Sequence, residues 1–360
     1  MDAAIDTVNP NVNREELSAI LVSECVGLGP LEQYLDEAET RDVYINRFDR
    51  VIVRRDGRLI EAKRAFSHPQ FLTAAAYRLP GPREVETLTD EIKFGDGTKV
   101  HVILPPLASE GPAITVRKPP THHPSLDDLS QTGTLSAGMV EFLRQATIAG
   151  RSVLVAGPTS SGKSTLLSAL VSQLPAATRV VSVEDNAHLQ LPSNSVRLET
   201  SPASGYDSRF LVQSALAMHP ERIIVDECRG AEGYEWVTAA ACGTEGSMAT
   251  LHGTSATDAL GRLESLCLLG SRDLSPRGIR EQIARAVNIV VVVHKTNQGF
   301  RVQQITEVQG VDLDAFRLND VFYYRVEGTG GAFHPTGYIP LFYEDMRNAG
   351  VDVDFGIFRE

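Results

Sequence analysis

The chain has 360 residues, 42% of them hydrophobic, with a formal net charge of −12 and a sequence pI near 5.3. This length and composition favour a globular protein with two domains. The acidic charge argues against a protein that tracks along nucleic acid, which needs a basic surface, although a local basic patch stays compatible with it.

No apolar stretch approaches the ~20 residues that span a bilayer, and residues 1–13 are too polar for a signal peptide. The four cysteines form neither a C-x-x-C pair nor a zinc spacing, so we expect buried thiols in a reducing cytoplasm: Cys25, Cys228, Cys242 and Cys267. These features predict a cytoplasmic protein without zinc that reaches a membrane only through partners.

Residues 1–118 are predicted to form a small α+β domain. A helix is expected over residues 13–26, with Asn13 as its cap and Glu16 completing a capping box, and the run 27–30 ends it. Asp56-Gly57 and Asp96-Gly97 suit tight turns that need positive φ, which predicts two hairpins. The hairpin strands are expected at 51–54 with 58–60 and at 91–94 with 99–104, a helix at 69–79 and a last strand at 113–117.

Residues 119–138, rich in Pro, His, Ser, Thr and Gly, are the predicted linker. Over residues 139–360, short apolar runs then alternate with helical segments, which predicts an α/β domain with a parallel sheet and helices on both faces. Its strands are expected at 152–156, 179–183, 222–226, 248–251 and 287–294. Residues 340–360 are expected to be an irregular tail whose aromatic side chains pack on this domain.

The most specific motif lies between the strand 152–156 and a helix expected over 164–174. It has the P-loop pattern G-x-x-x-x-G-K-S: Gly157, Pro158, Thr159, Ser160, Ser161, Gly162, Lys163, Ser164 and Thr165. Backbone N–H groups of such a loop cradle phosphate oxygens, and the helix that follows adds its positive end. Lys163 can reach the β- and γ-phosphates, and the Ser164 hydroxyl can ligate Mg²⁺. The motif predicts bound ATP or ADP with Mg²⁺, although Ser160 stands where many P-loops carry another glycine.

An apolar strand at 222–226 ends in two acids, Asp226 and Glu227, which is a Walker B pattern. Asp226 can hold the hydration shell of Mg²⁺, and Glu227 can orient or deprotonate the attacking water. The alternative is a solvated pair of loop acids.

Other strands are expected to end at the same edge. Glu184 and Asp185 follow the strand 179–183 and would face the nucleotide or its water, the alternative being helix capping or a surface salt bridge. Thr250 and His252, at the end of the strand 248–251, are two residues apart and are therefore expected on the same side of it. His252 can sense the γ-phosphate, or it can be a structural histidine.

Phosphoryl transfer also needs positive charge on the γ-phosphate. Arg117 and Arg197 are the leading candidates, and Arg209 and Arg229 are weaker ones. Each of these arginines could instead form a surface or domain–domain ion pair, and for Arg117 and Arg197 both interpretations stay open.

Together these segments resemble secretion ATPases of the type II/type IV superfamily, and specifically the CpaF-type motors of tight-adherence (Tad) pili. The resemblance runs from about Leu17 to the end of the chain and includes the P-loop and the Walker B run, Asp box and His box. The matching segments are 27–32, 104–108, 114–118, 184–185, 222–230, 246–252, 279–284 and 305–308. Asp226 departs from it, because this family often has glycine at that position.

The resemblance implies a PAS-like N-terminal domain and a RecA-like P-loop ATPase domain, assembled as a homo-hexamer with nucleotide at the cleft between the two domains. ATP hydrolysis would drive domain rotations that act on an inner-membrane platform protein. These would extend or retract a pilus or power secretion, with the protein held at the inner membrane through its partners. By matched position, Lys163 and Ser164 bind phosphate and Mg²⁺ and Glu227 is the catalytic glutamate. In the same way, Glu184 is the Asp-box acid and His252 is the His-box histidine. Arg117 and Arg197 are the phosphate-contacting arginines.

Two other functions remain as alternatives. One is a regulatory or scaffold module that binds ATP without useful hydrolysis, against which the intact Glu227 and His252 weigh. The other is a conjugation or DNA-transfer ATPase of a sister branch, which the charge of −12 disfavours, so nucleic acid is not an expected partner.

Overall fold

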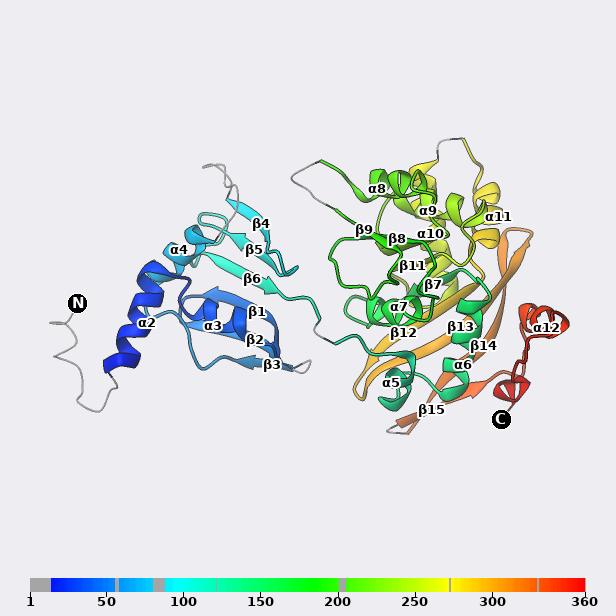
Figure 1. The fold of residues 1–360 in the computed structure, drawn as a ribbon, viewed down its shortest axis with the longest axis horizontal. Coiled ribbons are helices and arrows are strands. Elements are labelled where there is room, and N and C mark those ends of the chain that lie inside the picture. The colour runs from blue at the N-terminus through cyan, green and yellow to red at the C-terminus, as the bar shows by residue number, and fades with distance from the viewer. Residues whose placement is uncertain are drawn as a thin grey trace. The chain divides into compact units, whose positions relative to one another are not determined.

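The computed structural model describes residues 14–55, 58–79, 88–120, 122–200, 205–271, 273–328 and 330–359 (Figure 1). The chain divides into two compact units, residues 1–121 and 122–360. The predicted Asn13 cap and Asp56-Gly57 turn lie outside the described residues. The segment 119–138, expected as a linker, contains the helix α5 (Leu126–Gln131), which packs on α6 (Ala137–Ile148) and α7 (Lys163–Val171). The limits of the domains stay a prediction.

The first unit is built on an antiparallel sheet with the strand order β3-β2-β1-β6-β5-β4. Both predicted hairpins are confirmed, because β2 pairs with β3 and β4 pairs with β5. Gly97 has a φ of 86°, as the second turn requires. The strands are β1 (Thr40–Arg47), β2 (Arg50–Arg55), β3 (Arg58–Glu61), β4 (Thr89–Lys93), β5 (Lys99–Ile103) and β6 (Ala113–Arg117).

The strand that joins these hairpins was not predicted. β1 pairs with both β2 and β6, and its Val43 and Ile45 are buried in the core of the unit. The helix α2 (Arg14–Val26) ends before the run 27–30, as predicted. Pro30 then begins a short helix, α3 (Pro30–Asp36), which was not predicted. Leu31 and Tyr34 of α3 enter the same core. The predicted helix at 69–79 is confirmed as α4 (Pro69–Arg78).

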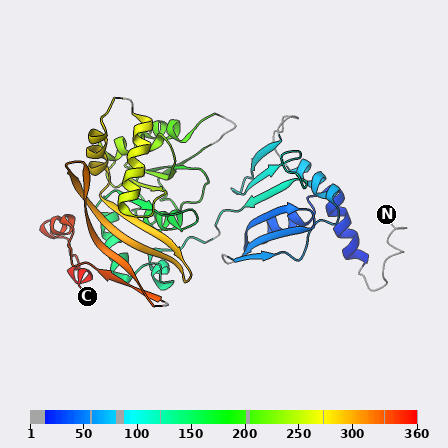
Figure 2. The ribbon, with the colours of Figure 1, turned by 180° about the vertical axis from the view of Figure 1, so that it is seen from behind.

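The second unit contains a mixed sheet with the order β15-β14-β13-β12-β7-β11-β10-β8-β9. The part from β12 to β9 is parallel, as predicted for this half of the chain. β13, β14 and β15 add antiparallel strands that were not predicted, and the long strands β13 and β14 (orange) are visible from behind in Figure 2. The bounds are β7 (Val153–Ala156), β8 (Val180–Glu184), β9 (Ser195–Glu199), β10 (Arg222–Cys228), β11 (Met248–Leu251), β12 (Ile289–Thr296), β13 (Gly299–Asp312), β14 (Ala315–Glu327) and β15 (Gly330–Pro335).

Helices cover both faces of the parallel strands. Successive residues of β7 enter two separate cores, Val153 and Val155 on one side and Leu154 and Ala156 on the other, as the pleat of a strand dictates. α5, α6 and α7 contribute to the first core. The second core contains residues of α8 (Ser208–Leu216), α9 (Glu232–Ala241), α10 (Ala256–Gly270) and α11 (Pro276–Ala286).

The described part of the segment 340–360 packs on this unit, as predicted, but the expectation of an irregular segment is wrong. They form α12 (Leu341–Asn348) and a 3-10 helix (Phe355–Phe358). Phe342, Tyr343 and Phe358 surround Phe142 of α6, with ring centroids 5.7, 5.9 and 6.2 Å from that of Phe142. Burial of these aromatic rings stabilises helices that the local sequence pattern does not predict.

The cysteine prediction holds for only part of the set. Cys228 and Cys267 are buried, whereas Cys25 and Cys242 are exposed, so for the latter two the expectation is wrong. In the described part of the chain, no helix is both long and apolar enough to cross a membrane.

Candidate active site

The P-loop has the backbone shape that phosphate binding requires. A Cβ added at Gly157 would lie 2.2 Å from the Val293 carbonyl oxygen and 2.4 Å from Ser161 Oγ, so only glycine fits there. Gly162, which precedes α7, has a φ of 95°. Ser160 also has a positive φ of 58°, a conformation that favours glycine and accounts for the glycine of many other P-loops at this position.

Two polar groups of the loop suit an anionic ligand. The buried Lys163 Nζ donates to the Pro158 carbonyl oxygen at 2.9 Å, and burial lowers the pKa of Lys163 despite the charges of Glu227 and Asp226. Ser161 Oγ is buried with no hydrogen-bond partner among the described residues. A phosphate oxygen would give Lys163 a counter-charge and Ser161 an acceptor, so the loop fits such a group.

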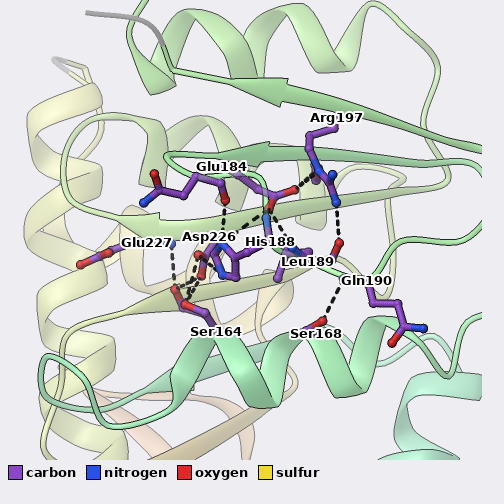
Figure 3. Close-up of polar contacts among 12 residues, drawn as sticks. Ser164, Ser168, Glu184, His188, Leu189, Gln190, Arg197, Asp226 and Glu227 are labelled. Carbon is purple, nitrogen blue, oxygen red and sulfur yellow. Dashed lines mark hydrogen bonds and ion pairs between the residues drawn. The ribbon is translucent and has the colours of Figure 1, made fainter. Parts of the chain in front are cut away.

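The Walker B carboxylate lies directly against the P-loop helix (Figure 3). Ser164 Oγ is 2.9 Å from Oδ1 and 3.1 Å from Oδ2 of Asp226, and Thr250 Oγ1 donates to Oδ1 at 2.9 Å. The contact arises because β11 lies between β7, which leads into the P-loop, and β10, which carries Asp226, so the carboxyl ends of these parallel strands meet at one edge. A hydroxyl and a carboxylate are the hard oxygen ligands that Mg²⁺ prefers, and the pair fits that ion.

Glu227 occupies an unusual backbone conformation beside Asp226. Its φ is 70°, and the register between β10 and β11 shifts between Val225 and Cys228. Its N–H donates to Thr250 Oγ1 at 2.7 Å, while its carboxylate contacts His252 Nε2 at 3.1 Å and Arg229 Nη2 at 2.8 Å. Strained residues and bulges gather at functional sites, where they direct a side chain that regular strand geometry would place elsewhere.

Glu184 is completely buried and engaged on both oxygens. Oε1 accepts from Ser182 Oγ at 2.7 Å and from Arg197 Nε at 2.9 Å, and Oε2 accepts from the N–H groups of His188 and Leu189 at 2.9 and 3.0 Å. Arg197 also donates to the Leu189 carbonyl oxygen. The structure thus brings Arg197 into the hydrogen-bond network of the buried Glu184 carboxylate. The predicted contacts of these two residues with water and phosphate stay a prediction.

The other candidate arginines differ in their position. Arg229, a weaker candidate by sequence, bridges Glu227 and Asp185, with Nη1 of Arg229 3.2 Å from Asp185 Oδ2. Arg209 pairs with Glu235 at 2.9 Å. Arg117 belongs to the first unit, where its Nε lies 3.3 Å from Asp42 Oδ1, and its role at a nucleotide stays a prediction.

His188 is the member of the site that the sequence analysis missed. Its Nε2 lies 3.2 Å from Asp226 Oδ2 and its Nδ1 lies 2.6 Å from the Asn186 carbonyl oxygen. Burial opposes charge on both groups, but their other contacts outweigh it. Contacts with Asp226, Asn186 and Glu184 raise the pKa of His188, and contacts with His188, Thr250 and Ser164 lower the pKa of Asp226. The only signal in the sequence was a histidine four residues after Glu184, and nothing local connects it with Asp226.

Comparison with known proteins now identifies the family. A family model described as "Type II/IV secretion system protein" matches residues 33–317. The chain belongs to this family. As a member of it, this type II/IV secretion protein is an ATPase, which agrees with the P-loop, Asp226 and Glu227 in one site.

Two relatives of this secretion protein carry names from conjugal transfer and type IV secretion. It is 29% identical over 285 residues to the conjugal transfer protein TrbB of Rhizobium radiobacter, covering 77% of this chain and 86% of TrbB. It is 33% identical over 236 residues to the type IV secretion system protein PtlH of Bordetella pertussis, covering 57% of this chain and 70% of PtlH. These names agree with the predicted superfamily but not specifically with the CpaF type.

A solved structure shows the same fold. The ATPase DotB of Legionella pneumophila matches with a TM-score of 0.55 at 21% identity, covering 79% of this chain and 80% of DotB. The likeness bears out the predicted architecture, an N-terminal domain followed by a RecA-like ATPase domain.

Proposed function

We propose that this ATPase is a Mg²⁺-dependent, homo-hexameric motor that drives secretion or pilus assembly through an inner-membrane platform protein. The observation that gives this proposal its strongest support is a continuous set of hydrogen bonds that joins the P-loop to both acids of the Walker B strand. It runs from Ser164 to Asp226, from Asp226 to Thr250, from Thr250 to Glu227, and from Glu227 to His252. This arrangement links a phosphate-binding loop to a group that can act on water.

Each residue of this set has a distinct part in hydrolysis. The loop N–H groups and Lys163 bind the β- and γ-phosphates, while Ser164 and Asp226 would hold the metal. Mg²⁺, when bound, neutralises charge on the phosphate oxygens. Glu227 orients the attacking water and accepts its proton, and the contacts with His252 and Arg229 keep that carboxylate in place.

Glu227→Gln tests the assignment of the water-orienting group. Glutamine keeps the size of the side chain but is a far weaker base, so we expect turnover to fall by about 10²–10⁴-fold while a fluorescent ADP analogue still binds. The matched control is Glu281→Gln on α11, an exposed acid paired only with Arg277 in the described contacts, which should hydrolyse ATP normally. Normal hydrolysis by Glu227→Gln would contradict the assignment.

The type IV secretion branch is supported by the names of the relatives, TrbB and PtlH. The Tad-pilus branch is supported by the segments 27–32 and 222–230 quoted above. Hydrolysis measured with and without duplex DNA at several salt concentrations separates these hypotheses. Salt-sensitive stimulation would favour a conjugation motor, and stimulation only by a pilus platform protein would favour the Tad branch.

The hexamer has its own test. Light scattering with and without nucleotide should find a particle of six chains when ATP and Mg²⁺ are present. A mass that stays that of one chain under both conditions would contradict the ring.

A further inference from the structure

The loop between β8 and β9 is fastened to the P-loop helix and carries His188. Gln190 N–H donates to Ser168 Oγ of α7 at 2.8 Å, and the N–H groups of His188 and Leu189 donate to Glu184 at the end of β8. Figure 3 shows these contacts around the imidazole ring. The backbone at His188 is therefore fixed with respect to the helix that begins with Lys163.

The ring itself is held in one orientation. Nδ1 lies 2.6 Å from the Asn186 carbonyl oxygen, which directs Nε2 to Asp226 Oδ2 at 3.2 Å. The side chain is 18% exposed, so little water competes for either nitrogen. The loop thus holds the imidazole ring in the orientation that places Nε2 against Asp226.

The two oxygens of Asp226 have different partners besides the Ser164 hydroxyl that they share. Thr250 donates to Oδ1 and His188 contacts Oδ2, while Ser164 Oγ lies within 3.1 Å of both. Ser164 is the hydroxyl that a metal would recruit. Without His188, Oδ2 would keep only that hydroxyl among the described partners. Once a metal recruited Ser164, the carboxylate would then be fixed through Oδ1 alone.

A carboxylate with 7% exposure needs hydrogen bonds to stay ionised and oriented. We propose that His188 is a positioning residue that holds Asp226 Oδ2, so that Asp226 and Ser164 together present an ordered pair of oxygens to Mg²⁺. The inference rests on the proposed Mg²⁺–nucleotide site. Partners that orient metal ligands commonly contribute about 10–100-fold to metal affinity.

A pair of substitutions isolates the contact. His188→Gln places an amide N–H near the position of Nε2 and keeps a donor for Asp226. His188→Asn places its amide near the position of Nδ1 and cannot reach Asp226. Binding of a fluorescent ADP analogue is measured in EDTA and across a Mg²⁺ titration, together with ATP turnover over the same titration and the melting temperature of each variant.

We expect His188→Asn to need about tenfold more Mg²⁺ for half-maximal nucleotide binding, with binding in EDTA unchanged and turnover recovered at saturating Mg²⁺. His188→Gln should restore the wild-type requirement. An unshifted Mg²⁺ requirement in His188→Asn overturns the inference. So does a loss that appears equally in EDTA or merely follows the melting temperature. Wild-type protein that binds the analogue with no effect of Mg²⁺ would instead remove the proposed metal site, and the inference with it.

Asp226→Gly supplies a background in which the inference makes a second prediction. Because His188 acts through Asp226, adding His188→Asn to Asp226→Gly should not shift the Mg²⁺ requirement further. An additional tenfold shift in the double variant would show that His188 acts by another route. This comparison also holds if His188→Asn alone folds poorly.

Discussion

The two consecutive acids of β10 lie in contrasting surroundings. Asp226 is 7% exposed and is held by hydroxyl groups and by His188, whereas the side chain of Glu227 is 25% exposed and lies between Arg229 and His252. The first environment suits a group that must stay fixed as a ligand. The second suits a group that must meet water and exchange a proton. Two neighbouring carboxylates can thus take different roles because their partners and their exposure differ.

The largest expected effect separates the two acids by their response to metal. At low Mg²⁺, Asp226→Asn and Glu227→Gln should both lose turnover, but raising Mg²⁺ should recover much of the activity of Asp226→Asn alone. Glu227→Gln should stay about 10²–10⁴-fold slow at every Mg²⁺ concentration, since its loss is one of base strength. Steady-state rates across a Mg²⁺ titration check this. Equal recovery of the two variants would break the comparison.

Thr250 joins the two environments, so its removal should affect both. Its hydroxyl donates to Asp226 and accepts from the Glu227 N–H, and the side chain is completely buried. Thr250→Val leaves both partners without it, and we expect roughly tenfold lower turnover together with a higher Mg²⁺ requirement. Thr250→Ser keeps the hydroxyl and is the control. If Thr250→Val changed only one of the two quantities, the hydroxyl would not link the two acids.

Arg229 and Arg197 each pair with an acid of the site, and their removal should have smaller effects that differ in kind. Arg229→Ala removes a charged partner of Glu227, and we expect about tenfold slower turnover with little change in melting temperature. The side chain of Arg229 is 61% exposed, so its loss should leave the core intact. Unchanged turnover in Arg229→Ala would exclude it as a support of Glu227.

Arg197→Ala should give the smallest effect on turnover and act on stability instead. It leaves an oxygen of the fully buried Glu184 without its charged partner, which we expect to cost about 1–2 kcal/mol of unfolding free energy. A unit of this size should then melt roughly 2–4 °C lower per kcal/mol. Calorimetry checks the expectation. Slow turnover with an unchanged melting temperature would instead support the phosphate contact predicted for Arg197 from the sequence.

The features that the sequence predicted correctly are those that depend on local patterns of residues. The P-loop and the Asp-Gly hairpin around Gly97 depend on residues close together in the chain, and both were found. β1 was missed because its pairing with β2 and β6 is settled by tertiary contacts of Val43 and Ile45 rather than by a turn signal. His188 was missed for the same reason, since its partner Asp226 belongs to another strand. The sequence motivates the arginines only as contacts of the γ-phosphate, with Arg117 and Arg197 ahead of Arg229, and it does not predict that Arg229 pairs with Glu227.

The aromatic cluster around Phe142 has a consequence for how the protein is made. Phe142 lies early in the second unit, and its ring partners Phe342, Tyr343 and Phe358 follow much later in the chain. A ribosome must therefore release residue 358 before this core can close, whereas the antiparallel sheet of the first unit, complete at Arg117, can form much earlier. Synthesis from the N-terminus therefore allows the sheet of the first unit to form before the aromatic cluster of the second unit is complete.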